Sequence, residues 1–564
     1  MRELWKILNN VIHKSKGKVC YPKHFTVEGK ENDNMMDVAN CFNKFFVNIG
    51  SDLAEKIPDV GRDTGNHNFI NRNLSSMFLR NVEEKEVIQV VSACKNKTSR
   101  DCNDIDMILV KNVIECISKP LTYICNLSFQ TGTFPNQMKV AKVIPVYKAG
   151  DKHDFTNYRP VSLLSQFSKI LEKLFVARLN TFLEKNKILN ESQYGFRSKR
   201  STALALLDSV EEIANSLENK MYTIGIFLDL QKAFDTINHD ILIDKLERYG
   251  IRGRVLDWVK SYLTDRKQFV QLGDFCSLLL DVSCGVPQGA VLGPILFILY
   301  INDICKVSDV LKLVLFADDT TIFCTGDDLQ ALEQEMNTEL KKIKSWLDRN
   351  KLSLNLGKTK LMVFGNMGTN DVEIKLDDKI IEKVNEIKFL GVLIDDKINW
   401  KSHISHVQRK VSRSISVINK AKHDLNKNSL RILYCSLVLP YFTYCAEVWG
   451  NNYKTALHPL VILQKKAIRI IHGVGYREHT NILFANSKLL KFQDIVDLLT
   501  VQIVFRASKD NLPKNIQLLF SKRVGVGYNL RHTQNFKVRW ANNKRKRLCP
   551  SVQGVKLWNN LGRQ

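Results

Sequence analysis

Three aspartates in this sequence have the surroundings expected of ligands for divalent cations. Asp318 and Asp319 are adjacent and interrupt two apolar, β-rich runs in KLVLFADDTTIF, so a hairpin turn is expected to present both carboxylates on one side. Asp229 ends the apolar run TIGIFLDL, where a strand leaving a core would expose it. Phosphodiester synthesis by in-line displacement uses two divalent cations about 3.5–4 Å apart. Mg²⁺ prefers carboxylate oxygens and substrate phosphates, so the three aspartates are candidates for such a site.

Each of these carboxylates, taken alone, also has an ordinary structural explanation. Acidic pairs in turns commonly satisfy the hydrogen bonding of the turn itself. Asp229 could equally cap the segment QKAFDTIN that follows it. The catalytic interpretation therefore depends on the rest of the chain.

The elements that must position these residues change along the sequence. Residues 1–75 are expected to form a helical extension and linker, and Pro120 is expected to interrupt the helical segments between 82 and 130. From Val140, short β-branched runs alternate with long amphipathic segments, which predicts an α/β or α+β fold. After Asp396, apolar residues at helical spacing alternate with Lys and Arg, which predicts a basic helical region.

Almost all of the net charge of +25 lies in that last region. Residues 397–564 hold 30 Lys and Arg against 6 Asp and Glu, whereas residues 1–396 hold 53 against 52. A concentrated positive field suits a polyanion, and nucleic acid is favoured over an anionic membrane or a merely solubilising surface. Removal of residues 397–564 is therefore expected to leave a weakly binding, distributive remainder.

Several other classes of protein are disfavoured. The 13 cysteines include no C-x-x-C pair, and the histidines, His403 and His406 among them, lack thiol or acidic partners at ligand spacing, so a structural zinc is not expected. No apolar run approaches the roughly 20 residues that span a bilayer, and the N-terminus has no apolar core of a secretory signal. We expect an intracellular protein without a membrane partner.

The ordered motifs FLDLQKAFDTINHDIL, GVPQGAVLGPILFILYIND and FADDT resemble motifs A, B and C of reverse transcriptases, in particular those of jockey-like non-LTR retrotransposons. The resemblance extends to KVIPVYKAGDKHDFTNYRPVSLLS in the fingers, to QYGFRSKRST before motif A, to KLSLNLGKTKLMVFG as motif D, and to KFLGVLID as the strand closing the palm. These motifs cover residues 140–395. Weaker similarity continues on both sides, in DVANCFNKFFVNIG upstream and in LPYFTYCAEVWGN, LQKKAIRII and VQGVKLWNN downstream.

The resemblance implies roles for individual residues. Asp229, Asp318 and Asp319 would hold two Mg²⁺ ions, with Mn²⁺ as the alternative metal, and Phe234 would be the aromatic gate that excludes a ribose 2′ hydroxyl. Gln288 and Gly289 would contact the incoming nucleotide or the template. The remaining implied residues are basic. Lys148 and Arg159 would bind the triphosphate, and Lys358 would be a general acid for pyrophosphate.

The implied fold is a right-hand polymerase of fingers, palm and thumb. We expect a helical extension over residues 1–75, fingers and palm over 76–395, and a basic helical thumb and nucleic-acid-binding region over 396–564. No domain-sized segment precedes the linker, so the N-terminal endonuclease of such elements is expected to be missing.

The expected reaction is RNA-templated DNA synthesis, with an RNA template, a DNA primer and dNTPs as partners. One alternative is a group II intron maturase or retron-type polymerase. Another is a decayed or domesticated element protein that binds RNA without polymerising. The expected location is the cytoplasm and nucleus, and KRKR at residues 544–547 is a candidate nuclear address.

Overall fold

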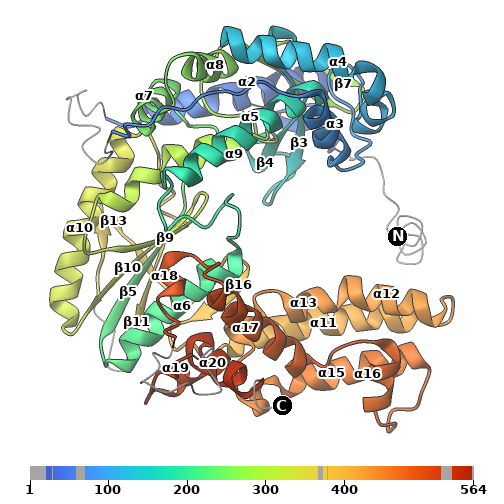
Figure 1. Ribbon diagram of the computed structural model, residues 1–564, viewed down its shortest axis with the longest axis vertical. Helices are drawn as coiled ribbons and strands as arrows, with labels where there is room; N and C mark the ends of the chain where they lie inside the picture. The colour runs from blue at the N-terminus through green and yellow to red at the C-terminus, as the bar shows by residue number, and fades with distance from the viewer. Residues whose placement is uncertain are drawn as a thin grey trace.

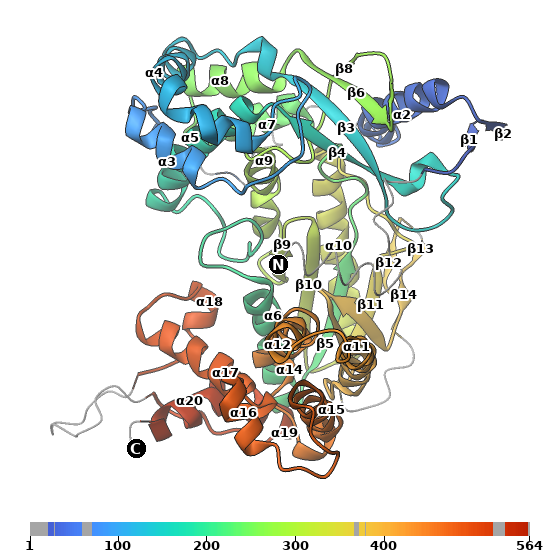
Figure 2. The same cartoon turned by 90° about the vertical axis from the view of Figure 1, so that its right-hand side faces the viewer.

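The fold combines helices with two five-stranded sheets. The computed structural model describes residues 21–58 except 28, residues 70 and 72–365, residues 372–522 except 378, and residues 536–561. Most helices before residue 300 lie at one end of the molecule and the helices after residue 400 at the other, with the sheet that contains strands 222–228 and 319–326 between them (Figures 1 and 2). The helix of residues 202–218 is the exception, because it packs against the C-terminal helices. The mixed helix and sheet content agrees with the α+β expectation.

The helices and strands come in the following order. Up to residue 228 they are β1 (Phe25–Val27), β2 (Lys30–Asn32), α2 (Met35–Glu55), α3 (Glu84–Ser92), α4 (Met107–Thr131), β3 (Val140–Tyr147), β4 (Tyr158–Leu164), α5 (Gln166–Lys185), α6 (Thr202–Glu218) and β5 (Tyr222–Leu228). They continue to residue 395 with α7 (His239–Tyr249), α8 (Arg254–Leu263), β6 (Arg266–Leu272), β7 (Phe275–Cys276), β8 (Leu280–Val282), α9 (Gly293–Tyr300), β9 (Lys312–Phe316), β10 (Asp319–Gly326), α10 (Leu329–Arg349), β11 (Lys360–Phe364), β12 (Lys375–Leu376), β13 (Lys379–Ile380), β14 (Glu382–Lys383), β15 (Glu386–Phe389) and β16 (Val392–Asp395). The later helices are α11 (Lys401–Ala421), α12 (Lys427–Leu437), α13 (Leu439–Thr443), α14 (Ala446–Trp449), α15 (Lys454–His472), α16 (Asn481–Ser487), α17 (Phe492–Ser508), α18 (Lys514–Gln517), α19 (Lys544–Leu548) and α20 (Pro550–Leu561).

The sheet that carries the three aspartates has the order β14-β11-β5-β10-β9, and both of its faces are buried. Ile224 and Ile226 of β5 lie in a core shared with α9 and α10, whereas Phe227 of the same strand lies in a second core on the opposite face. Successive strand residues alternate between faces, so a strand covered on both sides is apolar throughout. This double burial explains the uninterrupted hydrophobic run that precedes Asp229.

The second face of this sheet is covered partly by the C-terminal helices. Phe227, Phe323 and Phe364 lie in one hydrophobic cluster with Val407 of α11 and Trp449 of α14. The C-terminal helices therefore share a core with residues of this sheet, and the effect of removing residues 397–564 stays a prediction.

Two local expectations from the sequence are wrong. Helix α4 continues through Pro120, which removes only the intrahelical donor to the carbonyl of Cys116. The segment KFLGVLID, expected as the strand that closes the palm, does not add a strand to the sheet β14-β11-β5-β10-β9. Its strands β15 and β16 pair with each other as a hairpin, and β14 is the strand that pairs in parallel with β11.

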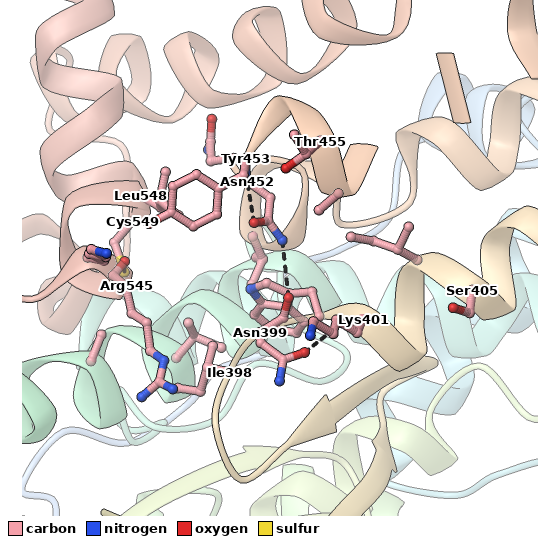
Figure 3. Close-up of a pocket in the computed structure, with 18 of the residues that line it drawn as sticks. Ile398, Asn399, Lys401, Ser405, Asn452, Tyr453, Thr455, Arg545, Leu548 and Cys549 are labelled. Carbon is pink, nitrogen blue, oxygen red and sulfur yellow. Dashed lines mark hydrogen bonds between the residues drawn. The ribbon is translucent and has the colours of Figure 1, made fainter. Parts of the chain in front are cut away.

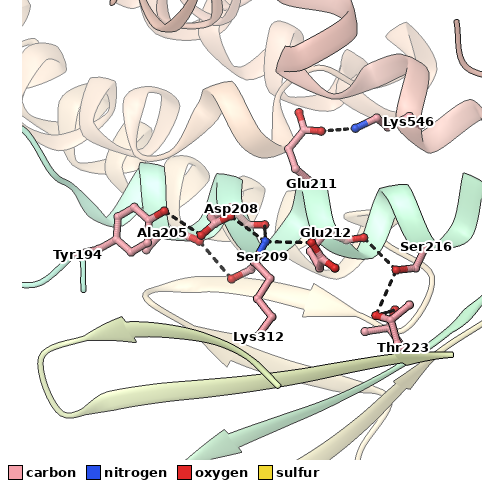
Figure 4. A network of polar contacts seen from close by, with 11 residues as sticks. Tyr194, Ala205, Asp208, Ser209, Glu211, Glu212, Ser216, Thr223, Lys312 and Lys546 are labelled. Atoms are coloured by element: carbon pink, nitrogen blue, oxygen red, sulfur yellow. Dashed lines mark hydrogen bonds and ion pairs between the residues drawn. The ribbon is translucent and has the colours of Figure 1, made fainter. Parts of the chain in front are cut away.

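The C-terminal helices α19 and α20 are fastened to α6 by buried polar contacts (Figure 4). Glu211 accepts an ion pair from Lys546, and it also accepts hydrogen bonds from the main-chain nitrogen (3.0 Å) and the hydroxyl (2.9 Å) of Ser551. The side chains of Glu211 and Lys546 are 1% and 5% exposed. One of the four basic residues of KRKR is thus part of the folded core, which limits this stretch as an accessible nuclear address.

His403 is a buried core residue of α11. Its Nδ1 accepts a hydrogen bond from the main-chain nitrogen of Leu393 at 3.3 Å, and its ring packs edge-on against Trp449. Burial and the nearby His406 lower the pKa of His403 to about 4 from its ordinary value of 6.5. The folded protein therefore keeps His403 neutral while the unfolded chain protonates it below pH 6.5.

Acidification through this window should favour the unfolded state. We expect the free energy of unfolding to fall by about 2–3 kcal/mol from this residue alone as the pH drops from 7 to 4. Urea denaturation of the parent and of His403→Gln across that range measures the contribution of His403 to the free energy of unfolding, because the variant should lose less stability on acidification. His458→Gln, on the exposed face of α15, should keep the parent's pH dependence. Equal slopes for the parent and His403→Gln would contradict the assignment.

No helix in the described parts of the chain is long and apolar enough to cross a membrane.

Candidate active site

The antiparallel pairing of β5 with β10 brings Asp229 and Asp319 opposite each other. Leu228 pairs with Thr320, so the next position outward places Asp229, which directly follows β5, beside Asp319, which opens β10. Residues that face each other across antiparallel strands project to the same side. The register thus explains how carboxylates 90 positions apart in the sequence lie at one end of the sheet.

Asp318 reaches the same place through a two-residue hairpin turn. Strands β9 and β10 pair as far as Phe316 and Asp319, which leaves Ala317 and Asp318 as the turn, and Ala317 adopts a positive φ of 57°. This conformation is strained for a residue with a Cβ and needs support from its surroundings. The support comes from Gln193.

Gln193 and Gly195 hold the turn from the segment QYGF. The buried Oε1 of Gln193 accepts hydrogen bonds from the main-chain nitrogens of Gly195 (2.7 Å) and Ala317 (3.1 Å). A Cβ at position 195 would collide with the main chain of Ala317, so only glycine allows this approach. Sequence reasoning assigned no function to either residue. Their contact with the turn is a tertiary feature that the sequence does not display.

The three carboxylates are close enough to perturb each other. Partial burial and the negative charges of Asp318 and Asp229 raise the pKa of Asp319 to about 6. Burial and Asp229 also raise the pKa of Asp318, while Arg159 and Lys148 act in the opposite direction. Like charges that converge in this way favour either protonation or a bound cation.

The donor set fits divalent metal ions that prefer oxygen. All three groups are carboxylates at the rim of a sheet, and their mutual repulsion would be relieved by positive charge. Within the described residues, no three His, Cys, Asp or Glu side chains form a ready-made metal cluster.

Basic side chains surround the aspartates. The Nζ of Lys358 lies 3.8 Å from Oδ2 of Asp229, and these side chains are 59% and 40% exposed. Lys148 and Arg159 come from the adjacent ends of β3 and β4, where Val146 pairs with Arg159. Burial and the positive charges of Lys358 and Arg159 lower the pKa of Lys148. The structure therefore brings all three predicted basic residues to the aspartates.

Phe234 lies in the turn after Asp229 and is half-buried. Its ring stacks on Phe297 of α9 at a centroid distance of 4.6 Å and meets the exposed Phe196 edge-on at 6.2 Å. The main-chain carbonyl of Phe234 accepts a hydrogen bond from Val286 at 2.9 Å, which ties this turn to the GVPQG loop. The position of the ring is thus fixed on two sides.

Gln288 is held by a residue that sequence reasoning missed. Its Nε2 donates to both carboxylate oxygens of Asp235, each at 2.9 Å. Burial raises the pKa of Asp235 to about 6, against the lowering effects of the Gln288 hydrogen bond and Lys232. Asp235 is six residues after Asp229 and was overlooked because a lone aspartate in a turn is common.

The glycines of GVPQG allow main-chain segments to pack closely. A Cβ on Gly289, whose φ is 133°, would collide with the carbonyl oxygen of Ser162 in β4, and the nitrogen of Ser162 donates to the carbonyl of Gln288 at 2.8 Å. A Cβ on Gly285 would meet the main chain of Asp235. The loop therefore connects β4 with the turn that follows Asp229.

Comparison with known proteins identifies the class to which this site belongs. Residues 150–394 match the family model described as reverse transcriptase (RNA-dependent DNA polymerase), so the chain carries a domain of the reverse transcriptase family. The match includes all the predicted site residues except Lys148, which precedes it by two positions. The resemblance inferred from motifs A to C is confirmed.

The similar proteins come from mobile elements. The chain is 30% identical over 385 residues to an RNA-directed DNA polymerase from mobile element jockey of Drosophila melanogaster, an alignment covering 66% of this chain and 42% of that protein. It is 26% identical over 424 residues to a probable RNA-directed DNA polymerase from transposon BS of the same species, covering 71% and 46%. A Pol polyprotein from the type-1 retrotransposable element R1 of Bradysia coprophila is 27% identical over 377 residues, covering 65% and 37%. The chain spans less than half the length of these relatives.

Proposed function

We propose that this chain is an RNA-directed DNA polymerase of a non-LTR retrotransposon, which copies element RNA into DNA from a primer 3′ hydroxyl. The observation that carries the proposal is the convergence of Asp229, Asp318 and Asp319 at one end of the sheet β14-β11-β5-β10-β9, within a domain of the reverse transcriptase family. The names of the mobile-element relatives support the same reaction.

In this proposal the three aspartates hold two Mg²⁺ ions, with Mn²⁺ as the alternative. Bound metal would activate the primer hydroxyl and neutralise charge on the leaving pyrophosphate. Burial and the charges of Asp318 and Asp229 raise the pKa of Asp319 to about 6, and a bound cation would relieve the repulsion among the three carboxylates.

The basic residues around the aspartates would bind and orient the triphosphate. Arg159 offers a planar fork of donors to phosphate oxygens, and Lys148 adds a second positive charge from the neighbouring strand. Lys358, whose Nζ lies 3.8 Å from Oδ2 of Asp229, would donate a proton to pyrophosphate. Gln288, held by Asp235, and Gly289 would line the nucleotide or template side of the site.

Phe234 is proposed as the gate against ribonucleotides. Phe234→Val should open space for a 2′ hydroxyl while keeping an apolar side chain against Phe297, so discrimination between dNTP and rNTP should fall by about tenfold or more. Single-nucleotide incorporation with each substrate measures the ratio. Phe275→Val, on the exposed β7, should leave the ratio unchanged. If the Phe234 variant keeps the parent's selectivity, the gate lies elsewhere.

We assign the fingers and palm to residues 76–395, with the helical extension before them and a thumb and nucleic-acid-binding region over 396–564. The surplus of basic residues after 397 supports the last assignment. The proposed partners are an RNA template, a DNA primer and dNTPs, and the proposed sites of action are the cytoplasm and nucleus.

Primer extension by the purified chain tests the proposed function. Incubation with poly(rA), oligo(dT), dTTP and Mg²⁺ should give extended primers, and replacing the template by poly(dA) reports the preference for RNA. Retention of RNA without any extension, in Mg²⁺ or Mn²⁺, would overturn the proposal and favour the non-polymerising element protein.

A further inference from the structure

A cavity away from the aspartates has the lining of a site for anions. It has a volume of about 840 Å³ and lies where α6, the start of α11, the start of α15 and α19 meet (Figure 3). Binding sites for small molecules and cofactors typically span about 300–1,000 Å³. The cavity is therefore large enough to hold one or two nucleotides.

The charged residues that line this cavity are all basic. Lys401, Lys544 and Arg545 are among the lining residues, and no Asp or Glu is. Within the described residues, no carboxylate forms an ion pair with any of these three side chains. An anionic ligand would therefore bind these cations without displacing a carboxylate.

The other lining groups are suited to a base and a sugar. Tyr453 presents a half-exposed ring, and Ile398 and Leu548 provide apolar surface. Asn399 and Asn452 form a fixed pair, with Nδ2 of Asn452 donating to the carbonyl of Asn399 at 3.2 Å (Figure 3). Aromatic rings that stack on bases, combined with basic groups that follow the phosphates, are the usual means of binding single strands.

The main chain adds to the positive potential. Helices α11 and α15 both begin at the cavity, neither has an acidic residue in its first turn, and a lysine occupies the first position of each, Lys401 and Lys454. Acidic residues are normally favoured at these positions, because the helix dipole is positive there. At the start of α11 the carboxylate of Asp395 already accepts from the main-chain nitrogens of Asn399 and Trp400, so it is the dipole of α15 that adds to the basic side chains.

We propose that this cavity binds nucleotides of a single-stranded RNA, with phosphates at Lys401, Lys544 and Arg545 and a base against Tyr453. The choice of RNA over other anions rests on the proposed function, since the template is the polyanion that a reverse transcriptase must handle. The cavity also assigns a role to KRKR: Lys544 and Arg545 line the site, while Lys546 fastens α19 to Glu211.

Photocrosslinking tests the site in the full-length protein. A 12-nucleotide RNA carrying 5-iodouridine is irradiated with the protein while unlabelled primer–template saturates the polymerising site. We expect a crosslinked peptide that contains Tyr453. Fluorescence anisotropy with the same RNA should show an affinity about tenfold or more lower for Lys401→Ala/Tyr453→Ala/Arg545→Ala.

A matched triple variant separates this effect from general loss of charge or aromatic surface. Lys85→Ala/Lys119→Ala/Tyr123→Ala removes one exposed cation of α3 and one exposed cation and one exposed tyrosine of α4. None of these residues lines the cavity or lies in the basic region after residue 397, so this variant should bind within about twofold of the parent. Lys401→Glu is the second test variant: its side chain is exposed, so a loss of affinity with an unchanged thermal midpoint cannot come from misfolding.

The outcomes distinguish the proposals. Unchanged RNA affinity in the cavity variants, or crosslinks only outside the cavity, would overturn the inference. Displacement of the crosslink by millimolar ATP but not by unlabelled RNA would also overturn it in favour of a free-nucleotide site. If the parent fails to extend primers while the cavity variants still lose RNA affinity, the polymerase proposal fails and the RNA site stands.

Discussion

Asp318→Asn should lower primer extension by at least about a thousandfold while leaving RNA affinity nearly unchanged. The substitution keeps the size of the side chain and removes the charge of a group that lies with Asp229 and Asp319. A catalytic group that acts as part of a unit typically costs several orders of magnitude in rate when it is removed. Most binding energy for nucleic acid comes instead from phosphate contacts spread over the basic surface.

Asp327→Asn provides the control for this prediction. Asp327 is exposed just beyond the opposite end of β10, where it is far along the strand from Asp319, and its neutralisation changes the net charge by the same amount. We expect extension within about twofold of the parent. If Asp318→Asn extends primers at a rate within about tenfold of the parent, the assignment of the three aspartates is wrong.

The site was predictable from the sequence where strand ends and turns carry the chemistry. An apolar run that ends in Asp229 and a second run broken by Asp318 and Asp319 define a buried strand and a hairpin, and antiparallel pairing of the two then brings the carboxylates together. The basic residues Lys148 and Arg159 could be assigned only through the family resemblance. Isolated cations in a sequence have no periodicity that distinguishes a ligand from a solvated side chain.

The residues that hold the site could not be predicted in the same way. Gln193 supports the turn at Ala317 across 124 positions of sequence, and Asp235 holds Gln288 across 53. Such contacts follow from how segments pack, and no local pattern records them. Gly195 shows the same limit, because its need for close approach appears only when Ala317 lies against it.

The fold was misjudged where tertiary packing overrides a local rule. Pro120 normally ends a helix, yet α4 buries Leu121 and Cys125 beyond the proline, and that burial offsets the lost hydrogen bond. The boundary at residue 396 rests on the distribution of charge, and it stays a prediction. The basic C-terminal region contributes Val407 and Trp449 to a core that also holds Phe227 of the sheet.

Lys546→Ala should destabilise the protein by about 3–5 kcal/mol, although the residue belongs to a stretch that looks like a surface signal in the sequence. The substitution would leave the carboxylate of Glu211 buried, with hydrogen bonds from Ser551 but without its cation. An uncompensated buried charge is costly because the protein cannot replace the solvation that it lost. The thermal midpoint and the urea midpoint should both fall, and hydrogen exchange in α19 and α20 should become faster.

Two further variants make the test specific to the buried pair. Lys556→Ala removes an exposed lysine of the adjoining helix α20 and should change the free energy of unfolding by no more than about 0.5 kcal/mol. Glu211→Gln/Lys546→Met removes both charges while keeping a side-chain oxygen that can accept from Ser551, so it should recover most of the lost stability. A Lys546→Ala protein as stable as Lys556→Ala would show that this lysine is solvated and that α19 does not dock on α6. A double variant no more stable than Lys546→Ala would show that the loss comes from packing, because removing the unpaired carboxylate would then bring no relief.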